Sequence, residues 1–375
     1  MPDRRATILA AAAELFAQKG VAGAGIDEIG ALAGVTGPAI YRHFRGKDAL
    51  VRAVILQGLA AFELPEGAIA DGLGAMSRHA AIAALDAPAF LVTYLRERHR
   101  LDGEARDELL ELERQLFRPW RDTMLDLQPS LDADELARRH RAVFTAVGAT
   151  ASRGSKTPRA RREDLLVDSM VAVLSLPPLP TRPPPAPAPT WSVPPGRRDQ
   201  ILAAAMTLFR QRGFHGVSMD DIGTATGITG PTIYFHYESK LDVLVEAHER
   251  ASIRTWVAVQ DAVRDAESAA DALDRLAAAQ LAVAAQNSDL ILVTSREIAM
   301  PDATDRERLE QRAADIVDIW TAVLGELRSE LGRSELRAVL TGVFPLMNQT
   351  AYLLARPEDG IALVRAWAQG GTPAA

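Results

Sequence analysis

The sequence predicts an all-α protein made of two similar halves. Apolar residues recur at helical spacing along the chain, without the sustained alternation of apolar and polar residues that indicates a strand. About half of the positions from Arg4 to Lys47 are identical to those from Arg197 to Lys240, and the agreement continues weakly beyond them. Ten of the 22 prolines fall between Pro177 and Pro195, in a segment unable to form the interior of a helix or strand. These observations predict two helical units joined by an extended spacer.

Composition excludes several classes of protein. A length of 375 residues suits two units, and 48% hydrophobic with 24% charged residues is typical of a globular chain. No apolar run is long enough to span a bilayer, so we expect no membrane partner. The absence of cysteine excludes disulfides, thiolate metal sites and cysteine nucleophiles. A formal charge of −7 means that any nucleic-acid contact is confined to a local patch.

The first helix of each half carries an apolar stripe at i, i+4, i+7 and i+8. The stripe comprises Ile8, Ala12, Leu15 and Phe16 and, in the second copy, Ile201, Ala205, Leu208 and Phe209. Gly20 and Gly213 follow at positions that favour a left-handed helix end. Because this string occurs twice, we expect the N-terminal copy to be folded structure rather than a signal peptide.

Two shorter helices follow in each half. The second runs through DEIGALAG in one copy and DDIGTATG in the other, and ends at Gly34 or Gly227. Ser218 with Asp221 predicts a reciprocal cap in the second copy, whereas Gly25 leaves the first copy less well capped. The third helix begins at a Thr-Gly-Pro sequence, with threonine as the candidate cap and proline in the first turn. This order of helix, helix, glycine turn and helix predicts a helix-turn-helix.

The strings GVTGPAIYRHFRGKDAL and GITGPTIYFHYESKLDVL resemble the signature of the tetracycline-repressor (TetR) family of bacterial transcription regulators. The resemblance covers about the first fifty residues of each half. It implies, in each half, an N-terminal three-helix DNA-binding domain and a helical domain for ligand binding and dimerisation. The boundaries that we expect are 1–50 and 51–176 for the first half, 177–196 for the proline-rich linker, and 197–245 and 246–375 for the second half. We call residues 1–50 head 1 and residues 197–245 head 2.

Candidate DNA contacts follow from the third helix and its surroundings. Tyrosine, histidine and lysine side chains along its rim suit phosphate contacts, while Thr36, Ala39 and Arg42 are the better candidates for base edges. The alternative is that the tyrosine and histidine pack the small core beside Ile40 and Phe44. The full set in head 1 is Thr36, Gly37, Pro38, Ala39, Tyr41, Arg42, His43 and Lys47. The set in head 2 is Thr229, Gly230, Pro231, Thr232, Tyr234, Phe235, His236 and Lys240.

The two copies differ where charge matters. Arg42 is replaced by Phe235, and Arg45 by Glu238. Losing cations near a phosphate rim weakens the electrostatic part of DNA affinity, so we expect unequal recognition of two half-sites.

Two heads in one chain predict an intrachain pseudo-dimer. Members of the resembling family dimerise so that their reading heads lie about one helical turn of DNA apart, roughly 34–36 Å. We expect the halves to pack through the last two helices of each, 132–151 and 161–176 against 334–355 and 358–368. A homodimer of chains with four heads is the alternative.

A small-molecule effector is implied by the same resemblance. The patterns LRERHRL and LERQLFRPW are similar to those of family members that sense fatty acyl thioesters. An apolar stripe with a few polar groups suits such a ligand, although ordinary core packing or surface ion pairs explain each residue singly. The candidate residues are Tyr94, Arg96, Arg98, Leu116, Trp120, Arg296, Trp320 and Asn348.

No motif supports catalysis, a metal site or a cofactor. The string GSKT at 154–157 lacks the remaining glycine of a phosphate loop and is absent from the second copy. We therefore expect a ligand-responsive transcriptional repressor that binds a double-stranded DNA operator and is cytoplasmic and nucleoid-associated. The alternative is a ligand- or partner-binding adaptor in which one or both heads have lost DNA binding.

Overall fold

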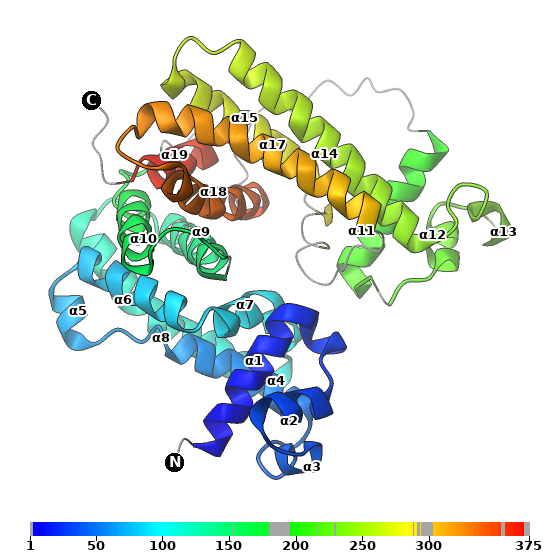
Figure 1. Ribbon diagram of the computed structural model, residues 1–375, viewed down its shortest axis with the longest axis horizontal. Coiled ribbons are helices and arrows are strands. Elements are labelled where there is room, and N and C mark those ends of the chain that lie inside the picture. Colours follow the sequence, from blue (N-terminus) through cyan, green and yellow to red (C-terminus); the bar gives the residue numbers. More distant parts are fainter. Residues whose placement is uncertain are drawn as a thin grey trace. The chain divides into compact units, whose positions relative to one another are not determined.

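The computed structural model describes residues 3–152, 154–179, 196–214, 216–228, 230–287, 289–290, 293, 303–353 and 357–370. These residues form helices joined by turns, with no strand among them, which confirms the all-α prediction (Figure 1). Most of the proline-rich linker, 180–195, lies outside the described residues.

The first half begins with three helices that share a small core. They are α1 (Arg4–Gly23), α2 (Ile26–Ala33) and α3 (Gly37–Ile40). Ile8, Phe16, Ile29 and Ile40 are at most 1% exposed, so the apolar stripe of α1 faces the other two helices as its spacing predicts. The backbone of α1 breaks at Gly20, where φ is +71°, a value that favours glycine.

Seven α-helices and one short 3-10 helix complete the described part of the first half. They are α4 (Lys47–Ala60), α5 (Glu66–Ala70), α6 (Leu73–Asp86), α7 (Pro88–Glu97), η1 (Arg98–Arg100), α8 (Gly103–Leu127), α9 (Ala133–Ser152) and α10 (Arg159–Leu174). The predicted boundary at 50/51 falls inside α4, so one continuous helix leaves head 1 and enters the larger helical domain.

The second half begins with the same three-helix order. Its described helices are α11 (Arg197–Arg212), α12 (Met219–Ala225), α13 (Gly230–Ile233), α14 (Lys240–Arg264), α15 (Ala269–Gln286), α17 (Ala303–Leu327), α18 (Arg333–Leu353) and α19 (Pro357–Gln369). α14 runs through the predicted boundary at 245/246, just as α4 does in the first half. Head 2 has its own buried core, which includes Ile201, Phe209, Ile222 and Ile233.

The chain divides into two compact units that do not follow the sequence repeat throughout. Unit 1 comprises residues 1–179 together with 330–346 and 366–375, and unit 2 comprises 180–329 and 347–365. Unit 1 therefore contains residues of α18 and α19, which belong to the second half of the sequence.

Within unit 1, α10 contacts these residues of the second half. Arg161 Nε donates to Glu335 Oε1 at 2.5 Å, and Ser169 Oγ donates to the carbonyl of Trp367 at 2.8 Å. The Trp367 indole is 1% exposed, and its Nε1 donates to the carbonyl of Val339 at 3.1 Å. A Cβ added at Gly342 would lie 2.4 Å from the Trp367 ring, so only glycine admits the indole here.

The beginning of the linker is held against α9 by a buried ion pair. Arg139, 1% exposed, pairs with Glu135 and donates to the carbonyls of Leu176 and Pro177. The backbone N–H of Leu179 donates to Glu135 Oε1 at 3.2 Å. The linker thus leaves unit 1 from a defined point.

Among the helices that the structure describes, none combines the length and apolar character needed to cross a membrane.

Candidate nucleic-acid interface

The turn between the second and third helices has the same backbone geometry in both heads. The N–H of Val35 donates to the carbonyl of Gly30 at 2.8 Å, and the N–H of Ile228 donates to Gly223 at 2.8 Å. Gly34 and Gly227, between these partners, both have φ of +68°. The sequence prediction that glycine ends these helices is therefore confirmed by a conformation that other residues rarely adopt.

Capping of the second helix follows the sequence in both heads. The Ser218 hydroxyl accepts from the N–H of Asp221 at 3.1 Å, and Asp221 Oδ2 accepts from the N–H of Ser218 at 2.8 Å. The Ser218 hydroxyl also donates to Asp221 Oδ2 at 2.6 Å. This bond and the bond from the N–H of Ser218, with a smaller contribution from Arg212, lower the pKa of Asp221. Gly25 offers no side chain in head 1, but Glu28 still accepts from its N–H at 3.3 Å.

The third helix is short, and helical turns continue beyond its end. In head 1 the N–H groups of Arg42, His43 and Phe44 donate to carbonyls three or four residues earlier, at 3.3, 2.9 and 3.0 Å. The equivalent distances in head 2 are 3.2, 2.9 and 3.1 Å. Thr36 occupies the N-cap position of α3, but its side chain makes no capping bond. This part of the expectation is wrong, and the hydroxyl of Thr36 lies on an exposed residue.

Head 1 presents most of its predicted contact residues to solvent. The exposed ones are Thr36, Pro38, Tyr41, Arg42 and His43, while Ala39 is half-buried and Gly37 is buried. Tyr41 is 56% exposed, whereas Ile40 beside it is 1% exposed. The tyrosine therefore does not pack in the core, as one interpretation of the sequence had it, and its hydroxyl is accessible.

Head 2 presents a different surface on the same backbone. Thr232, Tyr234 and Phe235 are exposed, and His236 is half-buried. Gly230 and Pro231 begin α13, and Thr229 lies outside the described residues.

The two predicted lysines lie at the start of the following helix rather than along the third one. Lys47 is the first residue of α4 and Lys240 the first of α14. The ammonium of Lys240 donates to the carbonyls of Phe214 and Val217 at 2.7 and 2.8 Å and lies 4.6 Å from the centre of the Phe214 ring. It therefore has a structural role in closing the loop before α12.

Both heads share internal contacts but differ in charge. Arg5 lies over the Phe44 ring at 5.2 Å, and Arg198 lies over the equivalent Tyr237 ring at 4.3 Å. Head 1 contains six Lys and Arg against five Asp and Glu, a net charge of +1, while head 2 contains five of each, a net charge of zero. Head 1 is therefore the stronger electrostatic partner for an anionic surface.

Three of the predicted effector residues are engaged inside unit 1. Tyr94, which is buried, donates to Glu113 Oε1 at 2.8 Å and accepts from Arg98 at 2.8 Å, and burial is the main cause of its raised pKa. Arg96 donates to the carbonyl of Ala17 in α1 at 2.8 Å. These contacts tie α7 to α8 and to head 1.

The other predicted effector residues are dispersed. Trp120 and Trp320 are core residues, 1% and 0% exposed, and Leu116 and Asn348 are half-buried. Trp320 Nε1 donates to Gln280 Oε1 at 3.0 Å. Arg296 lies outside the described residues.

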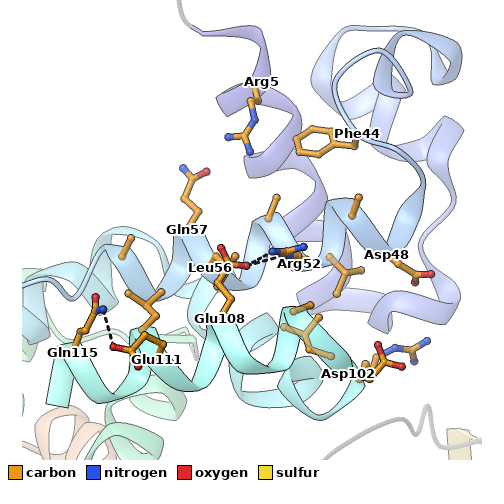
Figure 2. Close-up of a pocket in the computed structure, with 18 residues that line it drawn as sticks. Arg5, Phe44, Asp48, Arg52, Leu56, Gln57, Asp102, Glu108, Glu111 and Gln115 are labelled. Atoms are coloured by element: carbon orange, nitrogen blue, oxygen red, sulfur yellow. Dashed lines mark hydrogen bonds and ion pairs between the residues drawn. The ribbon is translucent and has the colours of Figure 1, made fainter.

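An open groove that the sequence did not indicate runs between α4 and α8 (Figure 2). It has a volume of about 1320 Å³ and reaches from Arg5 and Phe44 of head 1 along both helices. An ion pair between Arg52 of α4 and Glu108 of α8 crosses it. The available signal was the helical spacing of Leu109, Leu112, Leu116 and Trp120, of which Leu112 lines the groove. The packing of α4 onto α8 had to be known to recognise a groove.

No metal site accompanies these features: in the part of the chain that the structure describes, no three His, Asp or Glu side chains are grouped to hold an ion.

Comparison with known proteins identifies both heads. The model of the bacterial regulatory proteins of the tetR family matches residues 8–54 and again residues 201–247. The transcriptional activator FasR of Mycolicibacterium smegmatis is 35% identical over 68 residues, 18% of this chain, and the match spans 31% of its own length. A fatty acid metabolism regulator protein of Bacillus subtilis is 20% identical over 170 residues, 44% of this chain and 88% of its own. The solved structure of the fatty acid degradation regulator FadR from Bacillus halodurans is 21% identical, with a TM-score of 0.39, and the match covers 47% of this chain and 95% of that one.

Proposed function

Since the chain is a tandem member of the TetR family, with one DNA-binding domain of that family in each half, we propose that it is a transcriptional repressor that reads one operator with two heads. The observation that carries this proposal is the repeated helix-turn-helix, with matching turn hydrogen bonds and exposed side chains at equivalent positions. Because the two heads have the same backbone at the third helix, each suits insertion into one of two successive stretches of the major groove.

The two heads belong, in this proposal, to an intrachain pseudo-dimer. The contacts of α10 with Glu335 and Trp367 support it, because they join the last helices of the two sequence halves within unit 1. Both contacts are hydrogen bonds made by side chains of the first half, Arg161 and Ser169, with residues of the second half. A homodimer of chains is the competing arrangement.

A small-molecule effector would act on the proposed repressor through the groove between α4 and α8. α4 begins directly after the recognition segment of head 1, so a ligand that separates α8 from α4 would move that head. Such a ligand favours release only if it binds the moved state more tightly. A fatty acyl thioester is the candidate, supported by the resemblance of LRERHRL and by the name of the Bacillus subtilis relative.

A second function is favoured by one specific observation. Phe235 is 86% exposed and Glu238 replaces an arginine, so head 2 is a poorer electrostatic partner for DNA than head 1. An adaptor that binds a ligand or a partner protein through head 2 would have these features.

Selection of bound fragments from genomic DNA, followed by titration at several salt concentrations, separates the two functions. A repressor that neutralises four phosphates loses about a hundredfold in affinity between roughly 50 and 200 mM salt, since the logarithmic slope is about −0.9 per phosphate. Selected fragments should outcompete unrelated DNA of equal length. An adaptor without DNA affinity would enrich no fragment.

A further inference from the structure

Arg42 and Phe235 occupy the same place on two equivalent backbones. Each lies two residues after the buried isoleucine that ends the short third helix, Ile40 or Ile233. The backbone N–H of Arg42 donates to Ala39 at 3.3 Å and that of Phe235 donates to Thr232 at 3.2 Å, so the same turn presents both side chains.

Phe235 has no place in the core of head 2. It is 86% exposed, whereas Ile233 and Tyr237 on either side are 0% and 4% exposed. The inward face of this segment is therefore complete without Phe235, and the ring is directed to whatever head 2 binds. An exposed phenylalanine gains free energy when a partner covers it.

The surroundings of Phe235 favour a DNA base as that partner. Exposed hydroxyl-bearing side chains, those of Thr232 and Tyr234, lie in the same segment and suit phosphate oxygens. Lys240 is the only lysine or arginine between 229 and 240, and its ammonium donates to the carbonyls of Phe214 and Val217. Of the side chains that replace the base-edge candidates of head 1, Thr232 for Ala39 and Phe235 for Arg42, only Phe235 lacks a hydrogen-bonding group, so its base contact is apolar.

We propose that Phe235 contacts the 5-methyl group of a thymine, at the position of the second half-site where Arg42 contacts a guanine in the first. Arginine forms two hydrogen bonds with O6 and N7 of guanine, while an apolar ring distinguishes thymine by its methyl group alone. The operator is then asymmetric at one defined base pair. This inference rests on the proposed function and adds to it the base that each head prefers.

The test replaces single thymines of a selected operator by uracil, which lacks only the methyl group. The half-site of head 1 is identified first. It is the half-site in which base substitutions lower the affinity of the wild-type chain but not that of Arg42→Ala. In the other half-site, uracil at one position should weaken binding of the wild-type chain about fourfold, the amount expected for one buried methyl group. The same change should have no effect on Phe235→Ala, because the two losses are not independent.

A swap variant provides a gain of function that misfolding cannot imitate. Phe235→Arg should prefer guanine over thymine at that base pair, by about tenfold or more. If wild-type protein binds its operator but no uracil substitution in the second half-site changes affinity, or if Phe235→Ala responds as wild type does, the inference is overturned while the proposed function stands. If the wild-type chain enriches no DNA, both fail, and a protein partner for Phe235 takes their place.

Discussion

At the scale of single residues, burial in the core of the first half changes the protonation of His140. Its ring lies among Phe117, Trp120 and Phe144, at 4.6, 5.8 and 4.2 Å between centres, and its Nε2 is buried without a partner. Burial, with a smaller contribution from Arg141, lowers the pKa of His140 to about 3. The imidazole is therefore neutral at physiological pH.

His140 should make the protein less stable in mild acid. Its pKa is lower in the folded chain than the unfolded value of about 6.5, so below that pH only the unfolded chain takes up the proton, and stability falls. At about pH 5 the loss amounts to about 2 kcal/mol by proton linkage. Urea unfolding at neutral pH and at pH 5 measures it, with His140→Phe expected to lose less stability than wild type.

His43→Gln is the matched control, because that histidine is exposed. Loss of the acid sensitivity in His43→Gln would contradict this prediction. So would an unchanged acid sensitivity in His140→Phe, because another group would then cause it.

Arg42 should contribute more to DNA binding than Phe235. Arg42→Ala removes both a phosphate-attracting charge and a bidentate contact, and we expect a loss of at least about tenfold in operator affinity. Phe235→Ala removes one apolar contact and should cost about fourfold. Fluorescence anisotropy with a labelled operator measures both, and an equal or reversed ranking would refute unequal heads.

At the scale of helices, Gly30 of α2 is a position where backbone atoms leave no room for a side chain. A Cβ at Gly30 would lie 2.8 Å from the carbonyl oxygen of Val35 and 3.1 Å from the N of Gly37, both backbone atoms. Gly30→Ala should therefore displace α3, destabilise the protein by about 1–3 kcal/mol and weaken operator binding.

Gly67→Ala in α5 is the control for this substitution, since nothing lies within 4 Å of its Cβ. Thermal unfolding and anisotropy on the two variants should separate them. If the two variants have the same stability and the same operator affinity, the turn beside Gly30 accommodates a side chain.

The groove between α4 and α8 gives a test of the proposed effector site. Leu56→Trp should fill the groove and abolish release of the operator by a series of acyl-coenzyme A thioesters, with unchanged DNA affinity in their absence. Leu110→Trp, on the exposed side of α8, should respond as wild type does. If thioesters still release Leu56→Trp from the operator, the effector binds elsewhere. If they do not release the wild-type protein, thioesters are excluded as effectors.

Local patterns were predictable from sequence to the extent that they depend on neighbouring residues. The Ser218 cap, the glycine at 34 and the buried face of α1 each follow from a spacing of a few residues. The groove and the contacts of Lys240 with Phe214 and Val217 depend on which helices and loops pack together, and no short pattern encodes that. Sequence reasoning therefore found the heads and missed the groove.

At the scale of the whole molecule, the last helix links distant parts of the sequence. Trp367 is buried in unit 1, between Ser169 of α10 and Val339 of α18, in hydrogen bonds to both. The bond from Ser169 reaches the backbone carbonyl of Trp367, while the indole itself bonds to Val339 and packs on Gly342 of the second half.

Trp367→Ala should lower the free energy of unfolding by about 3–5 kcal/mol, the cost of removing a buried tryptophan. Phe235→Ala, which removes an exposed aromatic ring, should change it by less than about 0.5 kcal/mol. Chemical denaturation followed by circular dichroism compares them, and a small effect at 367 would show that the indole contributes little to the packing.

The central claim is that one chain supplies both heads to one operator. Light scattering of the purified protein, free and bound to its selected operator, tests it most directly when combined with footprinting of the fragment. The account predicts a free mass near that of the 40.4 kDa chain, one chain per operator, and protection of two half-sites about one helical turn apart. Two chains on a single palindrome, with one head of each protecting DNA, would contradict it.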